Sequence, residues 1–134
     1  MVLLSETEKI TINVGPVDLG RIDLLVEQGL YSNRTDLIRT AIRNQIERHD
    51  AVIQDITVRH SYSFGVLIYN HKDLEERRER GEKLSIHIVG MLTLANSITP
   101  ELALETIESI SIRGKLIASK AVREALGDRI NTGK

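Results

Sequence analysis

The sequence predicts an α+β protein in two parts. Residues 1–50 are expected to form a strand followed by two helices, and residues 51–134 a small α/β domain of about three strand–helix repeats. Two observations support this division. A short alternation of polar and apolar residues precedes two helical stripes near the N-terminus, and a strand-like motif recurs at a fixed spacing in the second part. The 134 residues suffice for one ordinary domain or two small ones.

The N-terminal part begins with a predicted strand. Residues 9–14 (Lys-Ile-Thr-Ile-Asn-Val) alternate polar and apolar side chains and are rich in β-branched residues. Pro16 suits the first turn of the helix that follows, which is expected to end near Gly29. Asn33 is the expected N-cap of a second helix, and Asp36 three residues later is typical of a capping box.

The predicted strand has no partner strand within residues 1–50. An isolated strand leaves its backbone donors and acceptors unpaired, and two short helices cannot close a core alone. We therefore expect two copies of the chain to combine, with their strands paired antiparallel and their four helices interlocked. The protein should be an obligate homodimer.

The second part is expected to alternate strands with helices, which favours a parallel sheet. In order, the elements are a long strand over residues 56–69, either continuous or broken, a charge-rich exposed helix over 71–82, a strand over 84–94, a helix capped by Thr99 and reaching about residue 107, a strand that restarts at Ile110, and a helix capped by Ser119 and ending at Gly127.

One motif recurs in this second part every 24 residues. It places an apolar residue at every second position, and two of its three copies carry a glycine, for which close packing is the expected reason. A period of about 20–29 residues is typical of short solenoids with one strand and one helix per turn, so right-handed crossovers between parallel strands are expected. The copies are Tyr62-x-Phe64-x-Val66-x-Ile68, Ile86-x-Ile88-x-Gly90-x-Leu92 and Ile110-x-Ile112-x-Gly114-x-Leu116.

The polar face of the N-terminal strand is a candidate for nucleic-acid recognition. If the apolar residues of this strand face the core, Lys9, Thr11 and Asn13 face away from it. A two-stranded ribbon fits the major groove of DNA, where Lys can donate to guanine, Asn can pair with adenine and Thr can touch the thymine methyl. From the strand alone, a plain solvent-exposed face remains an alternative.

Residues 8–48 resemble the ribbon-helix-helix (CopG-type) family of bacterial DNA-binding proteins. The resemblance is carried by the strand at 9–14, by Pro16, Leu19 and Ile22-Asp23-Leu24-Leu25-Val26, and above all by Gly29-Leu30-Tyr31-Ser32-Asn33-Arg34-Thr35-Asp36-Leu37-Ile38-Arg39. It implies that the ribbon reads base edges and that the start of the second helix clamps a phosphate. By this resemblance the base readers are Lys9, Thr11 and Asn13, and the clamp candidates are Asn33, Arg34 and Thr35.

The resemblance implies a sequence-specific transcriptional regulator, in particular a repressor that binds palindromic or repeated sites in double-stranded DNA as a homodimer. The C-terminal domain would join dimers, for instance into a tetramer, or sense an effector. Two alternatives remain open: an antitoxin whose C-terminal part sequesters a toxin, and a DNA organiser of the plasmid-partition type. A C-terminal part that folds alone favours the regulator over the antitoxin, because antitoxin tails of this family are typically short and fold on binding.

The C-terminal part is loosely similar to that of the nickel-responsive repressors, in approximate chain length and in its strand–helix beginning. Its histidines do not fit a nickel site: His49, His60, His71 and His87 are scattered, and Val89 stands where a second histidine would follow His87. We therefore expect no metal and no cofactor. His60 and His87 should be half-buried in the sheet, and the other two histidines should lie at the surface.

Composition excludes several further classes of function. The chain has no cysteine, which rules out a disulfide scaffold, a thiolate zinc site and a cysteine nucleophile. No nucleophile elbow or glycine-rich phosphate loop is present, so no enzymatic activity is expected. The apolar runs are far shorter than the ~20 residues that a membrane span needs, and a cytoplasmic protein is expected. The net charge of −1 gives no basic surface of the kind typical of DNA-binding proteins, so DNA binding must depend on local geometry.

Overall fold

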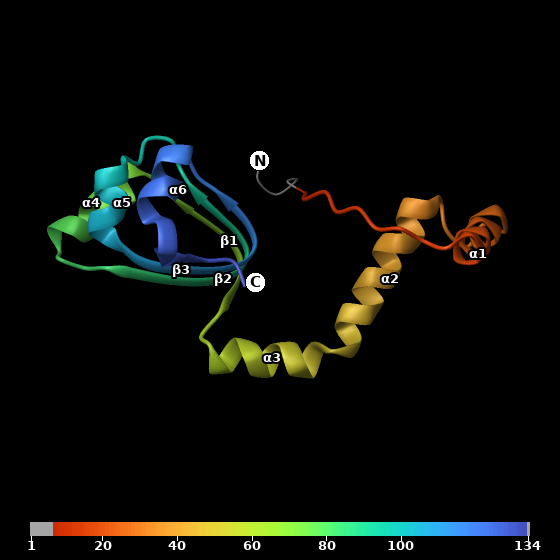
Figure 1. The fold of residues 1–134 in the computed structure, drawn as a ribbon. Coiled ribbons are helices and arrows are strands. Elements are labelled where there is room, and N and C mark those ends of the chain that lie inside the picture. Colours follow the sequence, from red (N-terminus) through yellow and green to blue (C-terminus); the bar gives the residue numbers. More distant parts are fainter. Residues whose placement is uncertain (1–6, 134) are drawn as a thin grey trace. The chain divides into compact units, whose positions relative to one another are not determined.

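A computed structural model describes residues 7–133, and the chain divides between Asp55 and Ile56 into two compact units. We call these the N-terminal unit and the C-terminal unit. Figure 1 shows helices in the first and a sheet covered by helices in the second. Among the described residues, no helix is long and apolar enough to cross a membrane.

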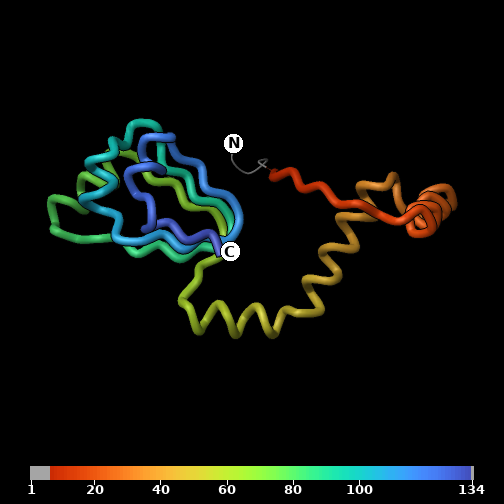
Figure 2. The backbone as a smooth tube through the Cα atoms, viewed as in Figure 1, coloured from red at the N-terminus to blue at the C-terminus, as the bar shows by residue number. Residues whose placement is uncertain are grey.

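The N-terminal unit consists of an extended segment and helices. α1 spans Pro16–Glu27 and begins with Pro at its first turn, as predicted. α2 spans Arg34–Arg48 and is N-capped by Asn33, which confirms the second helix and its start. The residues from 7 to 15 form no strand within the single chain and run as an extended segment, which Figure 2 shows at the start of the described trace.

The strand predicted from Ile56 onward is wrong in its first part. A third helix, α3, spans Asp50–Arg59, and the strand begins only at Ser63. The apolar residues Val52, Ile53 and Ile56 are spaced by one and three positions, which is a helical pattern. A turn with Ser61 at φ 56° separates the helix from the strand. His60 accordingly lies in this exposed turn and not in the sheet.

The C-terminal unit is a parallel four-stranded sheet in the order β1-β2-β3-β4. Each of the first three strands is followed by a helix, and in Figure 1 these helices lie on one face of the sheet. The fold class predicted from the sequence is thereby confirmed. The elements are β1 Ser63–Tyr69, α4 His71–Glu79, β2 Leu84–Leu94, α5 Pro100–Thr106, β3 Ile107–Ile117, α6 Lys120–Leu126, a 3-10 turn Gly127–Arg129 and β4 Ile130–Asn131.

Side-chain caps define the helix starts in this unit. Thr99 and Ser119 accept hydrogen bonds from the backbone N–H groups three residues on, as predicted. α4 begins with a full capping box in which Asn70 and Asp73 each accept from the other's backbone N–H at 2.9 Å. Between these helices and the sheet lies one apolar core, formed by Leu74, Leu84, Ile86, Ile88, Leu92, Leu94, Ile98, Leu102, Ala103, Ile107, Ile110, Ile112, Leu116, Val122 and Leu126.

The repeat is confirmed between β2 and β3 but shifted by one residue at β1. Gly90 pairs with Gly114, a separation of 24 residues, whereas Gly65 pairs with Gly90, a separation of 25. The first copy therefore does contain the glycine, at Gly65. A shift of one residue exchanges the two faces of a strand. Phe64 and its apolar neighbours at alternate positions consequently lie on the sheet face opposite the helices, not in the core.

Two of the three paired glycines, Gly90 and Gly114, are required by the close approach of neighbouring strands, whereas an added Cβ on Gly65 would meet nothing within 4 Å. Gly65, Gly90 and Gly114 have φ values of 128°, 141° and 128°, a region that favours glycine. A Cβ atom on Gly90 would collide with the carbonyl oxygen of Gly65, and one on Gly114 with that of Gly90. The predicted packing role of Gly90 and Gly114 is confirmed.

Candidate nucleic-acid interface

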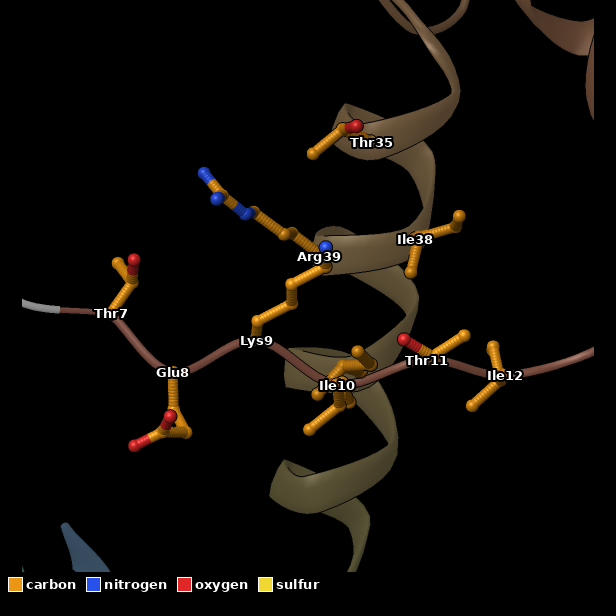
Figure 3. Close-up of a pocket in the computed structure, with 10 residues that line it drawn as sticks. Thr7, Glu8, Lys9, Ile10, Thr11, Ile12, Thr35, Ile38 and Arg39 are labelled. Carbon is orange, nitrogen blue, oxygen red and sulfur yellow. The ribbon is translucent and has the colours of Figure 1, made fainter.

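The extended segment and α2 of the N-terminal unit enclose an open groove of about 660 Å³. Figure 3 shows this groove with the segment crossing α2. Its apolar lining comes from both elements, but Ile10 and Ile12 remain 72% and 64% exposed. The groove is lined by Thr7, Glu8, Lys9, Ile10, Thr11, Ile12, Thr35, Ile38, Arg39 and Ile42.

The three predicted base readers are all exposed on the extended segment. In Figure 3, Lys9 and Thr11 project to the side opposite Glu8, as alternation along an extended chain requires. Lys9 and Thr11 line the groove, and Asn13 is not among the lining residues. The groove also brings in Arg39, a cation that the sequence analysis did not single out.

The predicted N-cap at the start of α2 is confirmed in its geometry. The Asn33 side-chain oxygen accepts from the backbone N–H of Asp36 at 2.8 Å. The reciprocal bond of a capping box is displaced by one residue, because the Asp36 carboxylate accepts from the backbone N–H of Ser32 at 2.9 Å instead of from Asn33. Both bonds fix the turn between α1 and α2.

The first N–H groups of α2 remain available to an anion. The N–H groups at the start of a helix have no acceptor within the helix, and among the described residues no acceptor is recorded for those of Arg34 and Thr35. They lie at the positive end of the helix dipole. Thr35 also borders the groove that contains Lys9 and Thr11, whereas Asn33 and Arg34 do not.

The guanidinium of Arg34 forms a bidentate ion pair with Asp23 of α1. Its Nε donates to Oδ1 at 2.8 Å and its Nη2 donates to Oδ2 at 2.9 Å. The hydrogen bond from Arg34 lowers the pKa of Asp23, and the same bond raises the pKa of Arg34. The pair joins the two helices across eleven residues of sequence, and no local pattern could have indicated it. We call this bidentate pair the fork; Nη1 of Arg34 takes no part in it.

The C-terminal unit carries a polar cluster on its uncovered sheet face. The Tyr62 hydroxyl and Ser111 Oγ are 2.8 Å apart, the Tyr62 ring stands edge-on to His87 with centroids 5.8 Å apart, and the Arg113 guanidinium lies 5.7 Å from the Tyr62 ring centroid. His87 is half-buried on β2, as predicted. Tyr62 thus contacts each of the other three side chains.

The remaining histidines also have local partners. His71 is half-buried, not fully at the surface: its ring contacts Glu75 through Nε2 at 2.8 Å and the Ser97 carbonyl through Nδ1 at 3.2 Å. His49 lies at the exposed C-terminal end of α2, beside Gln45. Within residues 7–133, no three His, Asp or Glu side chains are grouped so that they could hold a metal ion.

Comparison with known families assigns the chain to a class. A model of the ribbon-helix-helix transcriptional regulator family matches residues 5–123. The chain therefore belongs to the ribbon-helix-helix transcriptional regulator family, and it is a DNA-binding regulator by that membership. The match extends through most of the C-terminal unit but gives no support to a likeness with the nickel-responsive repressors. Neither the curated proteins nor the solved structures contain a match to this chain.

Proposed function

We propose that the protein is a sequence-specific transcriptional repressor of a bacterial cytoplasm that acts as an intertwined homodimer. Residues 9–14 of two copies pair as an antiparallel ribbon that enters the major groove. One observation carries the proposal: within residues 7–133 the extended segment has no partner strand, yet its apolar side chains border a groove lined by Ile38 and Ile42. A second copy supplies both the missing strand and the missing contacts.

The energetics favour such a dimer over a folded monomer. Burying one large aliphatic side chain contributes about 1.5–3 kcal/mol, and the N-terminal unit leaves many such side chains exposed. Its helices contain no buried residue at all within the described chain. Pairing the segments also satisfies backbone N–H and C=O groups that a lone strand leaves without partners. The exposed residues concerned include Ile10, Ile12, Val14, Leu24, Leu25, Ile42 and Ile46.

Within this dimer, Lys9, Thr11 and Asn13 of each copy read base edges from the polar face of the ribbon. The start of α2 holds a DNA phosphate through the N–H groups of Arg34 and Thr35, with Asn33 shaping the turn. Because the proposed phosphate contacts are confined to the start of α2 in each copy, few phosphates are neutralised. The logarithm of the binding constant should therefore fall gently with the logarithm of the salt concentration, by about 0.9 for each phosphate contact.

The test compares the DNA fragments that the wild type selects from the source genome with those that three variants select. The variants are Lys9→Ala, Thr11→Ala and Asn13→Ala. Each should cost about 1–3 kcal/mol and relax the preference at one base position. Lys72→Ala on α4, which removes an exposed cation from the C-terminal unit, is the matched control and should leave the preference unchanged. If all three variants keep the specificity of the wild type, the ribbon does not read DNA.

The same selection separates the two alternatives. A repressor occupies discrete operators, whereas a partition-type organiser coats DNA without them. An antitoxin would use the C-terminal unit to hold a toxin, and such tails are typically short and fold on binding. The C-terminal unit here has a continuous apolar core of its own, which supports a folded regulatory domain.

A further inference from the structure

The uncovered face of the C-terminal sheet carries an apolar stripe along its edge strand. Phe64, Val66 and Ile68 alternate on β1 and are 58%, 40% and 49% exposed. Their neighbours at positions 67 and 69 point to the opposite face, where they pack against the core. We call Phe64, Val66 and Ile68 the β1 stripe. It is distinct from the groove of the N-terminal unit.

The β1 stripe lacks the features that normally protect an edge strand. Exposed edges are usually kept from pairing by charged residues or proline, but β1 reads Ser-Phe-Gly-Val-Leu-Ile-Tyr and contains neither. Charged residues on this face occur on β3 as Arg113 and Lys115. Arg113 is held over the Tyr62 ring and donates to the Ile112 carbonyl. The part of the face nearest the free edge is therefore apolar and uncharged.

The size and symmetry of the stripe point to its occupant. Three side chains fall far short of the roughly 20–30 residues a side of a standard protein interface, so the stripe cannot hold an independent partner firmly. It can hold a unit that is already tethered nearby, since tethering raises the effective concentration to about the millimolar range. The stripe is also self-complementary: a twofold axis at Val66 places Phe64 of one copy against Ile68 of the other.

We infer that the β1 stripe packs against the β1 stripe of the second chain in the same ribbon dimer, an inference that rests on the proposed function for the tether. The two C-terminal units of a dimer thereby form a second, weaker interface. This interface restricts how far the two units can separate.

The absence of cysteine from the chain permits a direct test. Val66→Cys introduces a single thiol into the full-length protein, and Leu104→Cys on α5, at a residue 36% exposed, is the matched control. With a short bifunctional maleimide, Val66→Cys should form covalent dimers about tenfold faster than the control, and the rate should not change on dilution because the contact is made within one dimer. An equal rate for both variants, or a rate that falls with dilution, overturns the inference.

A second substitution tests whether the apolar stripe itself makes the contact. Phe64→Glu added to Val66→Cys should slow cross-linking to the rate of the Leu104→Cys control, while Leu104→Glu added to Val66→Cys should leave it fast. Melting of the C-terminal unit followed by circular dichroism verifies that both proteins stay folded. An unchanged cross-linking rate in the Phe64→Glu protein overturns the inference.

Failure of the ribbon is recognised separately. A wild-type protein that sediments as a folded monomer refutes the ribbon dimer of the proposed function. A dimeric wild type in which Val66→Cys reacts no faster than the control refutes the stripe contact alone.

Discussion

The two units of this chain solve the problem of burial in opposite ways. The C-terminal unit covers one face of a sheet with three helices and encloses a continuous apolar core. The N-terminal unit encloses no core: α1 and α2 have no buried residue in the described chain, and neither has α3, whose residues belong to both units. In the proposed ribbon dimer, the N-terminal unit would be completed by a second chain, whereas the C-terminal unit has its core within one chain. Dimerisation would then be part of folding for the N-terminal unit and a later contact for the C-terminal unit.

The largest effect is expected from a charge on the ribbon. Ile12→Asp places two carboxylates in the paired strands, and an unpaired buried charge costs about 3–5 kcal/mol, which corresponds to at least about a hundredfold weaker dimerisation. The variant should sediment as a monomer, lose DNA binding and lose the helical signal of the N-terminal unit. Hydrogen exchange should show the sheet of the C-terminal unit unchanged.

Leu104→Asp is the control for this substitution, because it places the same charge on an exposed position of the C-terminal unit. It should leave the dimer intact. If Ile12→Asp remains dimeric and binds DNA, the N-terminal unit does not depend on a second copy and the contrast between the units is lost.

The converse perturbation acts on the C-terminal unit. Gly90→Ala forces a Cβ against the carbonyl oxygen of Gly65 at a φ of 141°, and backbone strain with overpacking should cost about 3 kcal/mol. Gly81→Ala is the matched control, since Gly81 also has positive φ (68°) but nothing within 4 Å of an added Cβ. It should cost only about 1 kcal/mol.

The measurement for these glycine variants is thermal unfolding, followed separately in the two units. Gly90→Ala should lower the transition of the sheet while the wild-type dimer mass and DNA specificity persist at lower temperature. Equal destabilisation by Gly90→Ala and Gly81→Ala would show that the strands can separate, and that the glycine row is not required by close approach.

The sequence predicted the C-terminal strands and caps closely because their signals are local. Thr99 and Ser119 stand at their predicted caps, and the strand over Leu84–Leu94 has its predicted bounds. The errors arose where a local pattern fits two structures. Ile56 fits both the alternation that runs on to Ile68 and the helical spacing of Val52, Ile53 and Ile56, and alternation along β1 identifies two faces without saying which one is buried. Only pairing with β2 decides that Val66 is outside.

In the candidate nucleic-acid interface, too, features with a local sequence signal were predictable and features that depend on packing were not. The cap at Asn33 was predictable from spacing, since the acceptor and the N–H group are three residues apart. The Asp23–Arg34 pair was not, because its partners meet only when α1 packs against α2. The identity of Lys9, Thr11 and Asn13 as base readers remains a prediction, because the ribbon that would present them needs a second chain.

A moderate effect is expected from matched caps in the two units. Asn33→Ala and Thr99→Ala each remove one side-chain acceptor at a helix start, and each should cost about 1 kcal/mol. Asn33→Ala should lower the melting temperature of the dimeric N-terminal unit, and this melting temperature should depend on protein concentration. Thr99→Ala should lower the melting temperature of the C-terminal unit, which should not depend on protein concentration. Thermal unfolding over a range of concentrations distinguishes them. If both melting temperatures depend on protein concentration in the same way, the N-terminal unit does not differ from the C-terminal unit in needing a second chain to fold.

The smallest effect concerns the ion pair between α1 and α2. Asp23→Asn removes the carboxylate beside Arg34 and frees the guanidinium for phosphate, so DNA affinity should rise by a few-fold, about equally on all sequences, with a salt slope steeper by about one contact at most. Asp18→Asn on the same helix, where Asp18 lies 3.7 Å from Arg21, is the control and should change affinity less.

The same pair predicts a dependence on pH. Because Arg34 lowers the pKa of Asp23, the fork contributes stability that is present above the ordinary aspartate pKa of 3.8 and is lost as pH falls through the lower pKa of the folded state. Carboxyl NMR should show Asp23 titrating below the ordinary aspartate pKa of 3.8 in the wild type, and Arg34→Ala should move the pKa of Asp23 upward. The DNA-binding prediction for Asp23→Asn would be contradicted if this variant bound DNA more weakly than the wild type. The Asp23–Arg34 ion pair would then act by positioning the start of α2 for a phosphate, and this positioning would matter more to binding than the Arg34 charge that Asp23 neutralises.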